Sequence, residues 1–236
     1  IISLYKSIYV NVPKKYRREF AEKLRVDNLA RLKVMSIFIL MLMPFMVFAH
    51  FEIIERKYCT SIHFYCESLF GAHYGGIIFS IVYLLIYKFG NPIHWKPIIA
   101  EFFVFFSIQL FLLVFAISSL ASQLFSGNIS FFTTGAVFMA ALFVTYKRYA
   151  TILYLVTLAL FLIGLSKIQI NSSLLFSSAI NSIIAIFVAY CLNLIFFHYK
   201  LDDFLKSKMI DQKTREINRT LDDLKKDISV AKKIQG

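Results

Sequence analysis

The amino-acid sequence predicts an all-α membrane protein: a six-transmembrane-helix bundle with an N-terminal amphipathic helix and a C-terminal parallel coiled-coil signalling helix. Composition is the first observation, because the 236 residues are 58% hydrophobic and only 17% charged, whereas soluble domains contain about 45–50% apolar residues. The second is a series of six apolar stretches, each near the roughly 20 residues that cross a bilayer core of about 30 Å. The third is the position of the basic residues, which gather at the ends of these stretches.

The N-terminal segment 1–33 is predicted to be a basic juxtamembrane region on the cytoplasmic side. Within it, "VPKKYRREFAEKLRVDNLARLKV" has the pattern of an amphipathic helix that lies in the membrane surface. Its basic side chains are expected to meet anionic headgroups, and its apolar side chains to face lipid; these are Phe20, Leu24, Leu29 and Leu32. The net charge of +12 does not indicate a nucleic-acid partner, because basic and aromatic residues are not interleaved.

A transmembrane sensor domain is predicted over residues 34–197. Its six spans run from about Val34 to Phe51, Ser68 to Tyr87, Ile98 to Leu120, Ile129 to Tyr146, Tyr149 to Leu165, and Ser173 to Phe197. Only Lys147 and Arg148 separate the fourth span from the fifth, which predicts a tight antiparallel hairpin. Pro44, within "MLMPFMVF", lacks a backbone donor and is expected to kink the first span and to serve as a hinge.

The distribution of Lys and Arg predicts the orientation of the chain in the membrane. Of the 26 basic residues, nine precede the first span, two lie in the second loop, two in the fourth loop and ten after Phe197. The opposite face receives only Arg56, Lys57 and Lys167. Both termini are therefore predicted to be cytoplasmic.

The region 198–236 continues the sixth span without Gly or Pro and ends in "LDDLKKDISVAKKIQG". Its apolar and small residues alternate at spacings of four and three, which is the a/d seam of a coiled coil. The seam consists of Ile210, Thr214, Ile217, Leu221, Leu224, Ile228, Ala231 and Gln235. Leu201 and Leu205 are out of phase with it, so the register is expected to change before Ile210. A parallel homodimer is the favoured interpretation, and a solvated charged helix is the alternative.

Two parts of the sequence resemble known signalling proteins. The segment "LDDLKKDISVAKKIQ" is similar to the helix that leads into PPM-type serine/threonine phosphatases of the bacterial sporulation and stress-response kind, and Ala231, Ile234 and Gln235 match its "AxxIQ" pattern. The region entered through "VPKKYRREF…N…RLKV" is similar to six-helix sensor modules of diguanylate cyclases and histidine kinases.

The resemblance implies a receptor in the bacterial inner membrane whose output domain follows Gly236, so the chain is expected to be part of a longer protein. A phosphatase domain there would carry Mn or Mg, and no metal ligand of that family falls on residues of this chain. A cyclase or a histidine kinase is the alternative output.

Polar residues at membrane depth are costly and therefore mark candidate sites. Seven are predicted as ligand-sensing candidates: His50, Glu52, His73, Glu101, Gln109, Asn181 and Asn193. The first three form an outer layer, with His63, Glu55, Glu67 and Tyr74 nearby. The alternatives are a pocket for an unknown small ligand or a proton, a metal site, a haem held by two histidines, and plain interhelical hydrogen bonds. Glu101 could also reach the interface or pair with Lys88 or Lys96.

The cysteines divide between two environments. Cys59 and Cys66, in "CTSIHFYC", fall on the predicted outer side, where disulfides persist. The two alternatives are a disulfide between them within the loop and two separate thiols. Cys191 lies within the sixth span and is expected to be a packing residue.

No motif of the chain carries catalysis. Gly-rich phosphate loops, paired catalytic carboxylates and nucleophile elbows are absent from the sequence, so neither a catalytic residue nor a cofactor is predicted within it. A small transporter or channel is the alternative of another class, although the two halves show no repeat. A haem-containing electron-transfer anchor is a third.

Overall fold

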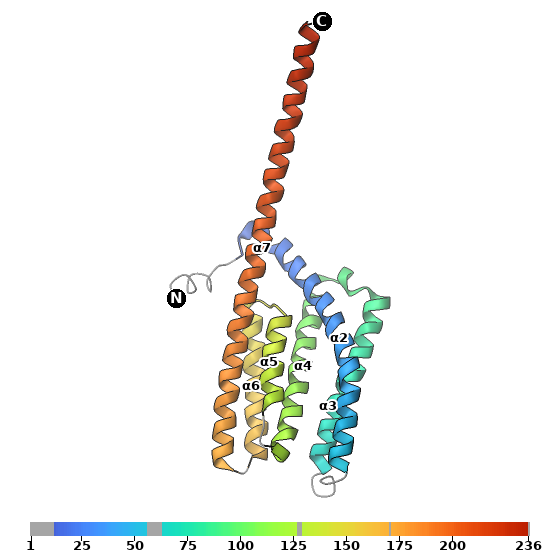
Figure 1. Cartoon of the computed structure of the whole chain (residues 1–236), viewed down its shortest axis with the longest axis vertical. Coiled ribbons are helices and arrows are strands. Elements are labelled where there is room, and N and C mark those ends of the chain that lie inside the picture. Colours follow the sequence, from blue (N-terminus) through green and yellow to red (C-terminus); the bar gives the residue numbers. More distant parts are fainter. Residues whose placement is uncertain (1–11, 56–62, 127–128, 170, 236) are drawn as a thin grey trace. The chain divides into compact units, whose positions relative to one another are not determined.

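The computed structural model describes residues 12–55, 63–126, 129–169 and 171–235, and every regular element within these ranges is helical (Figure 1). The elements are η1 (Lys14–Tyr16), α2 (Arg17–Glu55), α3 (His63–Leu85), η2 (Ile86–Gly90), η3 (Pro92–His94), α4 (Pro97–Ser126), α5 (Ser130–Leu142), α6 (Lys147–Ile168) and α7 (Ser172–Gln235). Two compact units divide the chain: one is Pro13–Phe197, and the other contains α7 from His198 onward.

The helices have the length and composition expected of a membrane protein. Helices α2, α3, α4, α6 and α7 contain stretches that are long and apolar enough to cross a bilayer, so within the described ranges five helices meet this criterion. Helix α5 has 13 residues and covers only about 20 Å at 1.5 Å per residue, less than a bilayer core. The all-α membrane class is therefore supported, whereas a total of six transmembrane spans stays a prediction.

The connection between α5 and α6 differs from the predicted two-residue hairpin. Helix α5 ends at Leu142, and Lys147 and Arg148 open α6 instead of joining two spans. Residues 143–146, called here the α5–α6 segment, are non-helical, and Phe143 is extended with φ −110° and ψ 126°. The predicted end of the fourth span at Tyr146 is wrong, because side chains of other helices take over the backbone hydrogen bonds of this segment.

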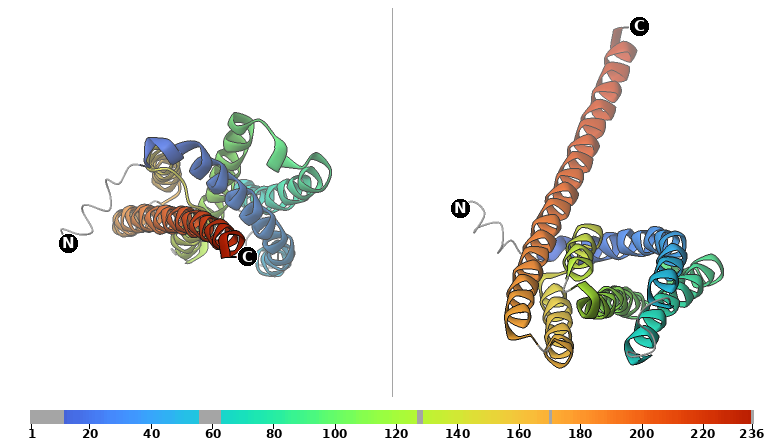
Figure 2. Two further views of the ribbon diagram at one scale, coloured as in Figure 1. Left: turned by 90° about the horizontal axis from the view of Figure 1, so that it is seen from above. Right: turned by 60° about the horizontal axis from the view of Figure 1, so that its bottom comes forward.

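Helix α2 joins two elements that were expected to be separate. Its 39 residues include both the basic segment and the first span. The expectation that Phe20, Leu24, Leu29 and Leu32 face lipid is wrong, since each is at most 5% exposed. Phe20 packs edge-to-face on Phe197 at 5.6 Å between ring centroids. The first half of α2 slants across the ends of α4 and α5 (Figure 2), so protein rather than lipid covers its apolar face.

Helix α4 is central to the Pro13–Phe197 unit. It contacts α2, α3, α5 and α6, and in Figure 1 it lies between α3 and α5. Small residues and stacked rings allow close packing around it: Phe132 of α5 stacks on Phe161 of α6 at 4.0 Å between centroids. Gly135 of α5 lies so close to α4 that a Cβ there would overlap the side chain of Phe115.

The outer surface of this unit is rich in large apolar side chains. Phe45, Phe102, Ile98 and Phe187 are each between 65% and 82% exposed. Soluble monomers rarely expose contiguous apolar surface on this scale. The surface is therefore compatible with contact with a lipid bilayer.

Substituting Gly135 tests the close contact between α4 and α5. Because the added methyl group of Gly135→Ala would overlap Phe115, we expect a loss of about 1–3 kcal/mol in stability, seen as a lower melting temperature by circular dichroism in detergent. Gly71→Ala is the matched control, because a Cβ there meets no atom within 4 Å. That variant should melt at or slightly above the wild type. Equal melting of the Gly135 variant and the wild type would contradict the contact.

Candidate functional site

A buried polar cluster surrounds the α5–α6 segment at the end of the bundle that the charge distribution predicts to be cytoplasmic. Asn28 of α2 is 4% exposed, and its Nδ2 donates to the carbonyl of Val144 at 2.8 Å. The N–H of Val144 donates back to Oδ1 of Asn28 at 3.4 Å. One amide side chain thus satisfies both backbone groups of a buried residue that belongs to no helix.

Arg31 satisfies the end of α5. Its guanidinium donates from Nη1 to the carbonyl of Leu142 at 2.7 Å. The last carbonyls of a helix lack partners within the helix and carry partial negative charge, so a cation at this position is favourable. Two residues before Arg31 on α2, the carbonyl of Leu29 accepts a 2.6 Å hydrogen bond from the hydroxyl of Tyr83 in α3.

Asn193 binds the same segment from α7. It is 2% exposed, and its Nδ2 donates to the carbonyl of Phe143 at 2.7 Å. The hydroxyl of Thr145 donates to Oδ1 of Asn193 at 3.3 Å. We call Asn28, Arg31 and Asn193, together with the backbone that they hold, the α5–α6 clamp. The clamp connects α2, α7 and the end of α5 through four consecutive residues.

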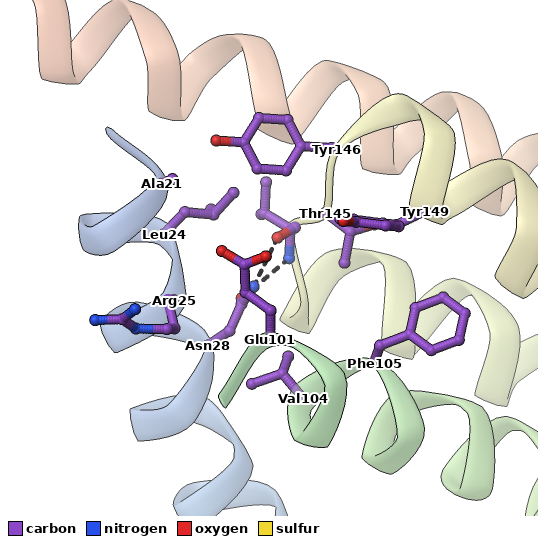
Figure 3. A pocket seen from close by; sticks show the side chains of 11 residues that line it. Ala21, Leu24, Arg25, Asn28, Glu101, Val104, Phe105, Thr145, Tyr146 and Tyr149 are labelled. Atoms are coloured by element: carbon purple, nitrogen blue, oxygen red, sulfur yellow. Dashed lines mark hydrogen bonds between the residues drawn. The ribbon is translucent and has the colours of Figure 1, made fainter. Parts of the chain in front are cut away.

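A small pocket of about 50 Å³ lies beside the clamp and is lined by Glu101, Asn28, Thr145 and Tyr146 among others. In Figure 3 the Glu101 carboxylate points into the pocket, while the guanidinium of Arg25 points away from it. This volume admits water but is far below the roughly 300 Å³ of the smallest typical ligand pockets. Within the described ranges Glu101 makes no ion pair with Lys88 or Lys96, so the predicted pairing is not seen.

Tyr146 borders this pocket at the start of α6. Burial raises the pKa of its hydroxyl, and the nearby Glu101 and Tyr149 act in the same direction. The hydroxyl therefore stays protonated and neutral at physiological pH.

The remaining inner candidates lie apart from the clamp. Gln109 of α4 donates from Nε2 to the hydroxyl of Thr157 in α6 at 2.9 Å, which is an interhelical hydrogen bond at mid-depth. Asn181 is exposed on the surface of α7. Of the predicted inner residues, the structure brings Asn193 and Glu101 to one region, and it separates Gln109 and Asn181 from them.

The predicted outer layer is described only in part. His73 is 1% exposed, and its Nδ1 lies 3.1 Å from Sδ of Met43 in α2. The side chains of His50 and Glu52, and the Cys59–Cys66 pair, lie outside the described residues. Among the side chains that the structure does describe, no group of three or more His, Cys, Asp or Glu residues could hold a metal ion.

Three further polar groups were not predicted from the sequence. Asn28 and Arg31 lie in a helix whose many charges suggest a water-exposed surface, although Asn28 follows Leu24 and precedes Leu32 at spacings of four and therefore shares their face. At the opposite end of the bundle, Oε1 of Gln123 accepts hydrogen bonds from Gln169 at 3.3 Å and Ser178 at 3.5 Å. This contact joins α4, the end of α6 and α7.

Comparison with known proteins gives no match to a family model, to a curated protein or to a solved structure. The geometry of the chain alone therefore carries the functional argument.

Removing the Asn28 side chain tests the clamp. Asn28→Ala would leave the buried carbonyl and N–H of Val144 without partners, and we expect a loss of about 1–3 kcal/mol in stability. Trypsin should then cut faster after Lys147 or Arg148, next to the released segment. Asn181→Ala removes an amide side chain from an exposed position and should change neither the melting temperature nor the rate of trypsin cleavage. Unchanged melting and cleavage of the Asn28 variant would show that the segment does not depend on this residue.

Proposed function

We propose that this chain is the membrane part of a signal-transducing receptor, in which a change in the packing of the bundle is passed along α7 to a cytoplasmic output domain. The observation that carries the proposal is α7 itself. It is an uninterrupted helix of 64 residues that carries clamp residue Asn193 in its apolar part and the heptad seam in its charged part.

The exposed seam supports a homodimer. Ile210, Ile217, Leu221, Leu224 and Ile228 are between 46% and 64% exposed in the single chain. Burying such side chains against a second copy contributes roughly 25 cal/mol per Å² of apolar surface, and a spacing of four and three places them on one face. The residues between the seam positions are charged and include the ion pair of Lys226 with Asp223 at 3.8 Å.

The clamp supports the idea of two packing states. Non-helical backbone at a membrane end needs partners from the protein, and here the partners come from two helices that are distant in sequence. If α2 shifts, the hydrogen bonds of Asn28 to Val144 must break or move. The α5–α6 segment then moves with them and displaces Asn193 of α7, which binds the carbonyl of Phe143. Discrete hydrogen-bond arrangements of this kind allow two-state rather than gradual changes.

The output class rests on the resemblance of residues 221–235 to the lead-in helix of PPM-type phosphatases. A protein-serine/threonine phosphatase is therefore the favoured output, and a nucleotide cyclase or a histidine kinase is the alternative. Each of these would require a domain after Gly236.

Cysteine substitution in the seam tests the homodimer. In a background of Cys59→Ser, Cys66→Ser and Cys191→Ala, we expect Leu221→Cys to form an intermolecular disulfide under mild oxidation, because paired a positions face each other. Lys226→Cys, at the outermost heptad position, is the matched control and should crosslink far less. Equal crosslinking at both positions would argue against a specific parallel coil.

Substituting Asn193 tests transmission through α7. With a dimerisation-dependent cyclase domain fused after Gly236, we expect Asn193→Ala to change the basal output several-fold, because it frees α7 from the α5–α6 segment. Asn181→Ala, on the same helix but exposed, should leave the output unchanged. If both variants match the wild type, the clamp does not control α7.

A further inference from the structure

An apolar groove of about 850 Å³ lies between α3, α4 and α6. Its volume falls within the roughly 300–1,000 Å³ of pockets that hold small organic ligands. The side chains lining it are apolar apart from Lys167, which is the one charged residue among them. The groove is distinct from the clamp and shares no residue with it.

The length of the groove matches one leaflet of a bilayer. Along α3 its lining extends from Gly71 to Val82, and along α4 from Leu110 to Ala121, which is about 16 Å on each helix at 1.5 Å per residue. A bilayer core is about 30 Å thick, so the groove covers about half of it. Lys167 lies near the C-terminal end of α6, on the side that the charge distribution predicts to be non-cytoplasmic.

Two glycines keep the α3 wall of the groove open. A Cβ at Gly71 or Gly75 would meet no atom within 4 Å, and both glycines are exposed along the groove. Exposed glycine leaves helix backbone uncovered, and in membranes such positions are normally covered by close packing. The groove therefore gives a bound molecule direct contact with the backbone of α3.

We propose that the groove binds one acyl chain of an anionic phospholipid from the leaflet on the Lys167 side, with the headgroup phosphate beside the Lys167 ammonium. The acyl chain contacts an apolar wall over the length of one leaflet, and the Lys167 ammonium lies at the end of the groove where a headgroup belongs. A second helix is the competing occupant, since Gly71 and Gly75 have the small-xxx-small spacing. Crossing helices approach closely only near such a pair, whereas the groove continues to Val82.

Native mass spectrometry of the full chain tests the proposal with two probes, phosphatidylglycerol and phosphatidylcholine with the same acyl chains. We expect phosphatidylglycerol to be retained about tenfold better. Gly75→Leu, which fills the groove, should abolish retention of both lipids. Lys167→Gln should keep lipid binding but lose the preference. The matched controls, Ala159→Leu on the exposed face of α6 and Lys147→Gln at its other end, should behave as the wild type.

A second measurement does not depend on any variant. Phosphatidylglycerol with a diazirine in its acyl chain should label the wild-type chain within residues 71–82, 110–121 and 164–168. Labelling spread evenly over all lipid-facing helices would overturn the proposal, as would unchanged retention in Gly75→Leu. If that variant loses dimers while retaining lipid, the groove is a helix–helix interface instead. The site does not rest on the proposed signalling role, because lipid retention is measured without any output domain.

Discussion

The backbone of residues 143–146 is the constraint on which the rest of the bundle depends. A non-helical segment at the end of a membrane bundle must satisfy its peptide groups through the protein. Here the carbonyls of Phe143 and Val144 accept hydrogen bonds from Asn193 and Asn28, and the carbonyl of Leu142, the last residue of α5, accepts one from Arg31. Because these donors come from α2 and α7, the first and last helices are held by the same short stretch of chain.

This constraint also explains the course of α2. A helix that supplies Asn28 to the α5–α6 segment and Arg31 to the last carbonyl of α5 must cross the ends of α4 and α5, and its apolar face then lies against protein. The polar clamp therefore occupies one end of the bundle. The apolar groove beside Gly71 lies toward the other end, where α3 and α4 leave space between them.

Part of the candidate site could be predicted from single residues. Asn193 and Glu101 were identified because a polar side chain within an apolar stretch is unusual wherever it lies. Asn28 and Arg31 could not be found in this way, because polar residues in a basic helix are ordinary. Their importance comes from Val144 and Leu142, more than 100 positions further along the chain. Gln109 was predicted, but its partner Thr157 becomes apparent only when α4 and α6 are packed together.

The sequence by itself determined the helical membrane class and the a/d pattern of the tail, because hydropathy and helical periodicity are local properties that each stretch carries alone. Only the tertiary structure decided where α5 ends and which surface covers Phe20, Leu24, Leu29 and Leu32. The physical reason is that lipid and protein satisfy an apolar face almost equally well. The choice between them depends on hydrogen bonds formed with distant residues.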